Sequence, residues 1–318
     1  MPEGADGFYS QTWYPVCRSH DLQPGQIIGK AFLDGRIVVW RGYSGEARVM
    51  SAYCVHLGTD LALGKVVGEK TQCAFHEWQY DCTGACAKTG NGDKVPPGAR
   101  LFDFPVLEEF GLIWAFNGTE PLWQFPKLRH PFDELYFLVE GPWEFPVDPW
   151  VIAGNTYDFQ HIEILHGFRL DGPYPDEEIE WGDFSIRYQV KFTNGFGNRG
   201  EFTYGTLGNN IFFAEGELDG DYYACLAPRA MPRAGQSEAF FTLMTHKGND
   251  DAEKEATARA LARRVADIET AVAQQGAAIL GSTKFCQGYL TAADKQTSRF
   301  FKYARNYPRA HPSAHYIG

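Results

Sequence analysis

The sequence lacks three features that would quickly assign a chain of 318 residues to a class of protein. It has no run of about 20 apolar residues, the length that a helix needs to cross a bilayer. Its start, MPEGADGFYSQTWYPV, lacks the basic and then apolar pattern of a secretory signal. Positive charge is scarce, with 29 Lys and Arg against 40 Asp and Glu and a net charge of −11. This balance disfavours nucleic acids and anionic membranes as partners, so we expect a soluble, cytoplasmic protein.

Cysteine is also too sparse for a disulfide framework. Seven cysteines are an odd number in a chain of this length without a signal, so metal binding or burial must explain them. Aromatic residues, by contrast, are abundant: 24 Phe, 16 Tyr and 8 Trp make up 15 % of the chain. This richness permits an aromatic-lined ligand cavity without showing one.

The hydrophobic pattern predicts an α+β protein in two parts. Residues 1–120 consist of short β segments separated by Gly and Pro, which indicates an all-β domain. Residues 121–318 start with a connecting stretch rich in Pro and aromatics. They then mix β segments between 179 and 245 with helical patterns at 151–168 and 256–276. In the second helix Leu261, Val265, Ile268 and Val272 recur at helical spacing, and we expect Gly276 to end it.

Two short motifs in the first part combine thiolates with imidazoles. Cys54-Val-His56 is followed, after sixteen residues, by Cys73-Ala-Phe-His76. A zinc site usually takes both Cys from one motif and both His from the other, whereas here each loop supplies one of each. This division suits a Rieske [2Fe–2S] cluster, in which two Cys hold one iron and two His hold the other. The alternatives are a structural zinc site and a coincidence of buried residues, which the joint spacing disfavours.

At these residues the chain resembles the Rieske non-haem iron oxygenases, and specifically their catalytic subunits. The resemblance is carried by YCVHLGTDLALGKVVG, CAFHEWQYDCTGAC and FGLIWAFNG, and it is nearest to the branch that acts on steroids and sterols, such as 3-ketosteroid 9-alpha-hydroxylases and cholesterol 7-desaturases. Two positions depart from the family, which often has Arg and Gly where this chain has Leu57 and Glu77. Respiratory-type Rieske proteins have a disulfide at the positions of Thr59 and Phe75, so the resemblance implies a cluster of low potential.

A second group of residues lies in GNTYDFQHIEILHGF. Asn155, Asp158, His161 and His166 match the pattern of the family's mononuclear iron site. On a helix Asp158 and His161 share a face, so the carboxylate could accept a hydrogen bond from the imidazole. The two histidines are about 140° apart on an ideal helix, so they can bind one ion only if the helix ends or bulges between them. Gly167 is placed to permit such an ending of the helix. The alternative interpretation is that both histidines are ordinary core residues that bind no metal.

The third iron ligand should be a carboxylate much later in the chain. Asp294 already has a local explanation, because Thr291 and Asp294 form a capping-box pattern at a helix start. Asp267 resembles the family's ligand segment and lies at the margin of the apolar stripe, so we expect Asp267 to be the ligand. Glu269 and Asp294 are the reserves.

The resemblance implies the terminal oxygenase of a multicomponent system, more a monooxygenase than a dioxygenase. Its cofactors would be the Rieske cluster and a mononuclear Fe(II), with electrons from NAD(P)H through a flavin and [2Fe–2S] reductase or a ferredoxin. The family further implies a homotrimer in which Asp158 carries the electron between the two sites. The expected substrate is bulky and apolar, such as a steroid or sterol, with an aromatic or smaller alicyclic compound as the alternative. The rival from another class is a non-catalytic Rieske electron carrier.

Overall fold

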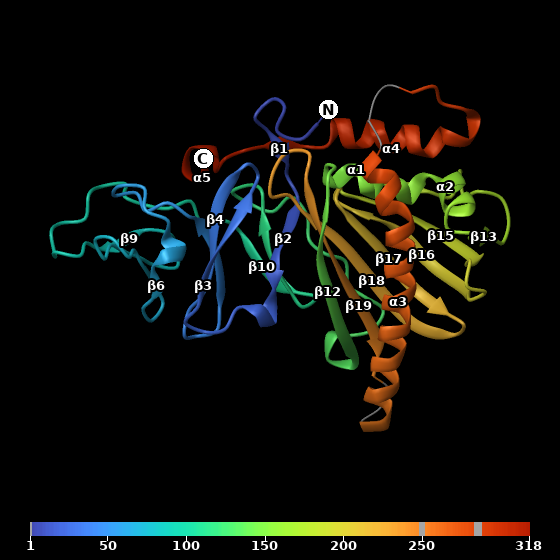
Figure 1. Cartoon of the computed structure of the whole chain (residues 1–318), viewed down its shortest axis with the longest axis horizontal. Helices are drawn as coiled ribbons and strands as arrows, with labels where there is room; N and C mark the ends of the chain where they lie inside the picture. The colour runs from blue at the N-terminus through green and yellow to red at the C-terminus, as the bar shows by residue number, and fades with distance from the viewer. Residues whose placement is uncertain (1, 248–251, 283–287) are drawn as a thin grey trace. The chain divides into compact units, whose positions relative to one another are not determined.

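The computed structural model describes residues 2–247, 252–282 and 288–318. The chain forms two compact units, one of residues 2–122 with 230–234 and 308–318, and one of residues 123–229 with 235–307. The first unit is built of β-strands and the second of a large sheet with helices, so the expected α+β class is confirmed (Figure 1). No helix in the described ranges combines the length and apolar character that crossing a membrane requires.

The first unit contains four small antiparallel sheets. Two of them have three strands each and enclose a core of buried side chains, which includes Phe32, Ile37 and Ile113. Their strand orders are β3(Ile27–Phe32)–β4(Gly35–Arg41)–β5(Ala47–Ser51) and β10(Val106–Glu109)–β11(Leu112–Phe116)–β2(Trp13–Arg18). The other two are β6(Lys65–Val66)–β7(Thr71–Gln72)–β8(Gln79–Tyr80)–β9(Cys86–Lys88) and β1(Tyr9–Ser10)–β20(Arg309–Ala310), and a short helix α5(Ala314–Ile317) follows.

The second unit is an eight-stranded antiparallel sheet with helices packed against it. Long strands alternate buried and exposed residues, as a sheet with one covered face requires. The strands run in the order β12(Leu135–Phe145), β19(Ser237–His246), β18(Asp221–Ala230), β17(Ile211–Leu218), β16(Arg199–Leu207), β15(Ser185–Thr193) and β13(Arg169–Leu170), with β14(Glu180–Trp181) beside β15.

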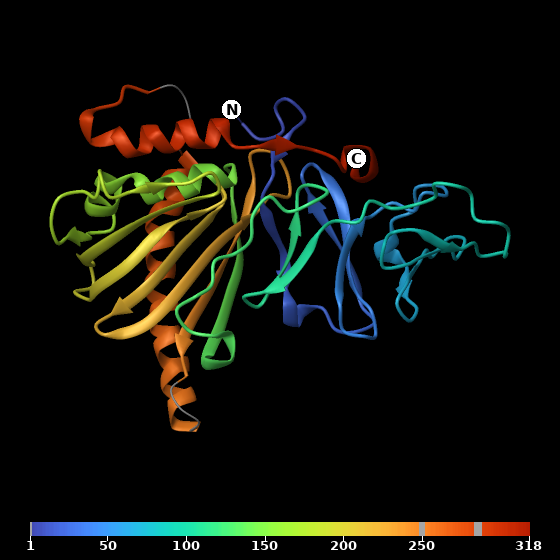
Figure 2. The ribbon, with the colours of Figure 1, turned by 180° about the vertical axis from the view of Figure 1, so that it is seen from behind.

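The helix α3(Ala252–Ser282) lies against β12 and β19, and Figure 1 looks onto the face that it covers, whereas Figure 2 looks onto the opposite face. The expected end at Gly276 is wrong, because the helix continues past this residue to Ser282. A Gly inside a helix costs only about 1 kcal/mol, which the surrounding turns can offset. The shorter helix expected after Thr291 is present: a 3-10 turn over Ala292–Asp294 leads into α4(Lys295–Asn306), and Thr291 with Asp294 forms the capping box.

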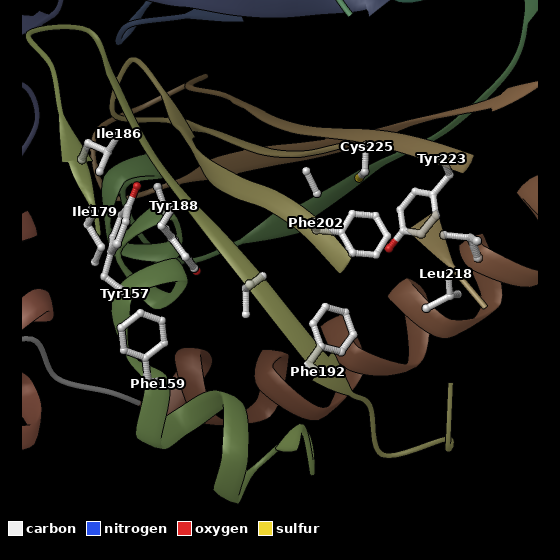
Figure 3. Packing of buried hydrophobic residues seen from close by; sticks show 14 of the residues in the cluster. Tyr157, Phe159, Ile179, Ile186, Tyr188, Phe192, Phe202, Leu218, Tyr223 and Cys225 are labelled. Atoms are coloured by element: carbon white, nitrogen blue, oxygen red, sulfur yellow. The ribbon is translucent and has the colours of Figure 1, made fainter. Parts of the chain in front are cut away.

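The core of the second unit is rich in aromatic rings. Figure 3 shows Phe192, Phe202 and Tyr223 side by side, with ring centroids 5.9 Å apart for the first pair and 4.7 Å for the second. Val265 from α3 and Phe300 from α4 belong to the same buried cluster. Much of the aromatic richness of this unit is therefore core packing, and part of it lines a cavity.

Candidate functional site

Two loops of the first unit have the same backbone architecture. In one, the Cys54 N–H bonds the Thr59 carbonyl at 2.9 Å and the Gly58 N–H bonds the Cys54 carbonyl at 2.8 Å. The other repeats this pattern, from Cys73 to the Trp78 carbonyl at 2.9 Å and from Glu77 to the Cys73 carbonyl at 3.2 Å. The two loops therefore share one backbone turn, although His56 follows its Cys by two residues and His76 by three.

The shared turn also shows how Glu77 can take the place of the glycine that is common in the family. Gly58 and Glu77 occupy the same place in their loops, and both have a left-handed backbone, with φ of 77° and 55°. This left-handed conformation costs a residue with a Cβ roughly 1 kcal/mol of conformational free energy, whereas Gly adopts it without that cost. Glu77 is thus a strained but tolerated substitute within an intact loop.

The four donors of these loops fall into two pairs. Cys54 and Cys73 are buried, and the pKa of the Cys54 thiol is raised by burial and by the neighbouring Cys73. The rings of His56 and His76 lie 4.7 Å apart, and the Nδ1 atom of His56 is buried without a hydrogen-bond partner. Trp78 stacks on His56 at 4.6 Å with only 5° between the planes. The donor set, two thiols together and two imidazoles together, fits the two irons of a Rieske cluster.

A single zinc ion fits these four residues poorly. Around a tetrahedral Zn²⁺ all ligand atoms lie within roughly 4 Å of one another. Within the part of the chain that the structure describes, no three donors from Cys54, His56, Cys73 and His76 lie within 4.8 Å of one another. The zinc alternative left open by the sequence is therefore disfavoured.

The second site is organised by a broken helical segment of the other unit. The predicted helix at 151–168 is in fact two short helices, α1(Pro149–Gly154) and α2(Phe159–Ile164), joined by a 3-10 turn over Asn155–Tyr157. Asp158 is the N-cap of α2, and its carboxylate accepts from the backbone N–H of His161 at 3.0 Å. The expected hydrogen bond from the His161 ring to Asp158 is absent, since the Nδ1 atom of that ring is buried without a partner. Asp158 orients the backbone at His161, not its ring.

His161 and His166 converge because α2 ends between them. The helix stops at Ile164, and Gly167 has φ of 66° and bonds the Glu163 carbonyl at 3.1 Å, which is the left-handed helix ending that glycine favours. The Nε2 atoms of the two histidines come within 2.9 Å of each other. Two imidazole nitrogens bound to one ion at a right angle, about 2.1 Å away, are about 3.0 Å apart. The pair is therefore spaced for adjacent positions on an octahedral metal.

The two histidines face an apolar cavity of the second unit. Asn155 also lines it, and so does Glu269 of α3. Burial raises the pKa of Glu269 to about 7, while burial and the neighbouring His166 lower the pKa of His161. The remaining walls are mostly aliphatic and aromatic: Phe145, Ile152, Ile162, Phe168, Tyr188, Tyr204, Phe212, Ala227, Ala239, Phe241, Val272, Ala273 and Leu280, with Thr156, Arg229 and Gly276.

The structure does not bring Asp267 to this cavity. Asp267 is exposed on α3, and Glu269, one of the two reserves, lines the cavity in its place. The reason is helical geometry: Glu269 lies four residues after Val265 and three before Val272, on the apolar stripe, whereas Asp267 lies off it. Asp294 bonds Thr291 in the capping box and accepts from Gln160 at 3.2 Å. Neither aspartate is positioned as a ligand.

A separate group of metal donors lies elsewhere in the same unit. His130, Glu134 and His246 have ligand atoms that all fall within 4.8 Å of one another, and in the described ranges this is the one such group of three. It shares no residue with the pair of His161 and His166. No local pattern in the sequence indicates this group, because its members are 116 residues apart at the extremes and meet only when β19 ends beside the turn before β12.

Comparison with known proteins identifies the first domain and the fold of the chain. Residues 12–99 match the Rieske [2Fe-2S] domain family, so the first unit carries a Rieske domain, whose cofactor is a [2Fe–2S] cluster. The whole chain has the fold of solved Rieske-type oxygenases, including a dicamba monooxygenase determined with non-haem iron and dicamba, at a TM-score of 0.64 and 16 % identity over 93 % of this chain and 96 % of that one. The resemblance to the Rieske oxygenases stated from the sequence is confirmed.

The particular relatives span several oxygenases. The chain is 32 % identical over 168 residues to a cholesterol 7-desaturase of Bombyx mori, over 51 % of this chain and 36 % of that protein. It is 29 % identical over 169 residues to the oxygenase component of a 3-ketosteroid-9-alpha-monooxygenase of Rhodococcus rhodochrous, over 50 % of this chain and 43 % of that protein. The match thus spans less than half the length of these relatives. NdmA of Pseudomonas putida CBB5, solved with caffeine, has a TM-score of 0.69 at 19 % identity over 93 % of this chain and 90 % of that one.

Proposed function

We propose that the protein is the terminal oxygenase component of a Rieske oxygenase system, a monooxygenase that uses O2 and electrons from NAD(P)H. The observation that carries the proposal is the approach of the His161 and His166 Nε2 atoms to 2.9 Å at the wall of an apolar cavity, in a chain that also has a Rieske domain. A mononuclear Fe(II) held there would supply O2 activation beside a C–H bond. On this proposal residues 1–120 deliver electrons and residues 121–318 hold the substrate.

The proposed ligands follow from the donor pairs. Cys54 and Cys73 would hold one iron of the cluster, and His56 and His76 the other. His161 and His166 would hold the mononuclear iron. We propose Glu269, not Asp267, as the carboxylate of this site, because it is the acid that shares the cavity with the histidines. Apolar walls around it would keep water out and orient the substrate.

The proposed substrate is a bulky apolar molecule, and the reaction is a hydroxylation, an oxidative demethylation or a desaturation. A steroid or sterol is the first candidate, which the names of the cholesterol 7-desaturase and 3-ketosteroid-9-alpha-monooxygenase relatives support. An aromatic or smaller alicyclic compound is the alternative, which the caffeine and dicamba complexes of the structural neighbours support.

We further propose a cytoplasmic homotrimer that takes electrons from a flavin and [2Fe–2S] reductase or a ferredoxin. Exposure of the cluster loops supports access for such partners: Leu57 is 66 % exposed and Phe75 is 61 % exposed. Asp158 would carry the electron between the cluster of one subunit and the iron site of its neighbour. Its partly exposed carboxylate, next to the backbone of His161, is compatible with that role.

One observation favours the rival, a non-catalytic Rieske electron carrier. Across the described ranges, no carboxylate oxygen lies within 4.8 Å of the ligand nitrogens of both His161 and His166. A carrier needs no third ligand because it has no mononuclear iron. The two functions therefore differ in the iron that the chain holds.

Iron and acid-labile sulfide analysis of the purified protein, combined with EPR before and after reduction, tests the proposal. The oxygenase predicts about three irons and two sulfides per chain, whereas the carrier predicts about two irons and two sulfides. O2 uptake stimulated by a steroid, sterol or aromatic compound, with NAD(P)H and a reductase, then tests the activity itself. A protein that is fully loaded with the cluster but has no mononuclear iron signal would overturn the oxygenase assignment.

A further inference from the structure

One charged side chain in the cavity has no role in the proposed iron site. Arg229 lies near the end of β18, lines the same cavity as His161, and is only 7 % exposed. A buried guanidinium is rare unless an acid or a full set of acceptors accompanies it. The groups around Arg229 therefore indicate the chemical class of ligand that the cavity binds.

The protein leaves much of the Arg229 guanidinium unsatisfied. Its Nη1 atom donates to the Ala227 carbonyl at 2.9 Å and, weakly, to the Asn210 carbonyl at 3.4 Å. Its Nε atom is buried without any acceptor, and Nη2 has no hydrogen bond to a described residue. A guanidinium has five N–H donors in a rigid fork, so most of them remain for a ligand.

No carboxylate of the described residues balances this charge. The pKa of Arg229 is lowered to about 10 by burial, and the neighbouring group that acts to raise it is Cys225, not a carboxylate. Glu269, the acid in the same cavity, forms no ion pair or hydrogen bond with Arg229 in the described structure. The cavity thus holds an unpaired cation among apolar walls, where its attraction for an anion is strongest.

We propose that Arg229 binds the carboxylate of the substrate, so that the protein acts on an apolar ring compound that carries an acidic group. This inference rests on the proposed oxygenase function and narrows its substrate class. Carboxylate oxygens match the free edge of the guanidinium fork, while rings such as those of Tyr188, Phe212 and Phe241 would contact the rest of the molecule. A sterol with only a hydroxyl group would leave the buried charge unpaired.

Binding of matched acid and amide pairs to the intact protein tests the subsite. The probes are benzoate, 4-phenylbenzoate and a steroid carboxylate, each paired with its primary amide, and the dissociation constants are measured by calorimetry without turnover. We expect the wild type to prefer at least one acid over its amide by about tenfold or more. R229Q should abolish that preference, and R229K should retain part of it. R169Q, at an exposed arginine of β13, is the matched control and should behave as the wild type.

The outcomes separate this inference from the proposed function. If no acid binds more tightly than its amide, or if R229Q keeps the preference, the carboxylate subsite is wrong even when neutral compounds stimulate O2 uptake. If acids are preferred but the chain holds no mononuclear iron, the subsite stands and the oxygenase assignment fails. If R229Q does not fold, the preference of the wild type for the acid over its amide, and a smaller preference in R229K, still test the carboxylate subsite.

A different observation carries a second proposal, which does not depend on the first. The Oε2 atom of Glu134 lies 3.5 Å from the His130 Nδ1 atom and 3.5 Å from the His246 Nε2 atom. Both separations are too long for a hydrogen bond of normal length. They are close to the roughly 3.4 Å that separates two ligands of a tetrahedral ion with bonds of about 2.1 Å. The centroids of the two imidazole rings lie 4.5 Å apart.

We propose that His130, Glu134 and His246 form a second metal site, for Zn²⁺ or a similar divalent transition metal. All three side chains are partly exposed, at 30 %, 50 % and 31 %, so a metal could enter from solvent and keep a water as its fourth ligand. The turn before β12 and the end of β19, which the β-ladder already joins, would be tied together.

Titration of the iron-loaded protein with Zn²⁺, and with Co²⁺ as a spectroscopic probe, tests this site. We expect one equivalent of Zn²⁺ to bind, with tetrahedral Co²⁺ absorption, and E134Q and H246A to weaken binding by at least about tenfold. Iron content should stay unchanged in both variants. Zn²⁺ binding that is equal in E134Q and H246A, or that is lost only in H161A, would mean an adventitious ion only, or metal at the other histidine pair, and would overturn the proposal.

Discussion

The Nδ1 atom of His166 lies 2.8 Å from the Oε1 atom of Gln275 in α3. An amide oxygen can only accept, so the proton of the His166 ring is on Nδ1 and its Nε2 lone pair points toward His161. A partner on the far nitrogen of a metal-binding histidine fixes its tautomer and orientation. Gln275, which is more than a hundred residues from His166 in the sequence, thus orients the His166 ring so that its Nε2 atom can bind a metal.

Replacing Gln275 should therefore weaken iron binding without touching the cluster. In Q275L we expect the affinity for the mononuclear iron to fall about tenfold or more, the range measured for such outer partners, whereas Q275E should retain it. Iron retained after dialysis against a chelator, together with the EPR of the Rieske cluster, measures both effects. Q274L, at the exposed neighbouring residue, is the control. Equal iron retention in Q275L and Q274L would contradict the role of Gln275.

The choice of the third ligand leads to a prediction with an internal control. Glu269 lines the cavity that the histidines face, whereas Asp267 is exposed on the same helix, so of the two acids we propose Glu269 as the iron ligand. E269Q keeps the shape of the side chain but removes its charge, and we expect mononuclear iron to fall by at least about tenfold in E269Q and to remain in D267N. Iron per cluster in the two purified variants decides between them. Loss of iron in D267N alone would restore Asp267 as the ligand.

Glu269 and Asp267 show how far the iron site can be predicted from the sequence. Spacing alone predicts Cys54, His56, Cys73 and His76 as cluster ligands, because short loops bring near neighbours together. The end of α2 between His161 and His166 was likewise signalled by Gly167. Resemblance to the family points to Asp267, whereas the apolar stripe of Val265 and Val272 places Glu269 on the face of α3 that packs inward.

Other features of the site depend on contacts that no local pattern encodes. Gln275 meets His166 only because α3 packs beside α2 at a particular depth, and Arg229 faces the cavity only through the register of β18 in the sheet. The side chains of a strand alternate between faces, but the sequence does not say which face will carry a cavity.

Substitutions of Asp158 can separate its structural role as a helix cap from its proposed role in electron transfer. Its carboxylate caps α2 at the His161 N–H, and Asn caps helices equally well, whereas Ala loses about 1 kcal/mol. We expect D158N to keep both metal centres and the melting temperature of the wild type but to oxidise its reduced cluster much more slowly when mixed with O2. D158A should share this defect and also melt earlier. Stopped-flow absorbance and thermal unfolding measure the two effects, and rapid cluster oxidation in D158N would remove Asp158 from the electron path.

Tyr80 should tune the potential of the Rieske cluster. Its hydroxyl accepts from the Val55 N–H at 3.1 Å and lies 3.0 Å from the Cys54 sulfur, so with Cys54 as a thiolate the hydroxyl proton is donated to sulfur. This bond favours the reduced, more negative cluster, and its loss in Y80F should lower the potential. A net bond of about 1 kcal/mol corresponds to roughly 40 mV for one electron. A redox titration followed by circular dichroism measures the shift. Y53F, at a partly buried tyrosine next to Cys54 in sequence, should leave the potential unchanged.

Asp103 gives the first unit a predictable dependence of stability on pH. Burial raises the pKa of Asp103 to about 6, although Arg48 and Arg100 act to lower it, whereas in the unfolded chain the pKa is about 3.9. Between about pH 4 and pH 6 the folded state therefore binds more protons than the unfolded state, so this group's contribution to stability is greatest at low pH and is lost as the pH rises through about 6.

D103N removes the charge that burial disfavours, so it should unfold at a higher temperature than the wild type at about pH 7.5 and at nearly the same temperature at about pH 3.5, where Asp103 is protonated in both the folded and the unfolded state. Because Asp103 is only partly buried, we expect a gain of roughly 1 kcal/mol, well below the full value of the pKa shift. Comparing variant and wild type at each pH cancels the titration of the other carboxylates. A difference between the two proteins that is the same at both pH values would mean that ionisation of Asp103 has no part in the stability of this unit.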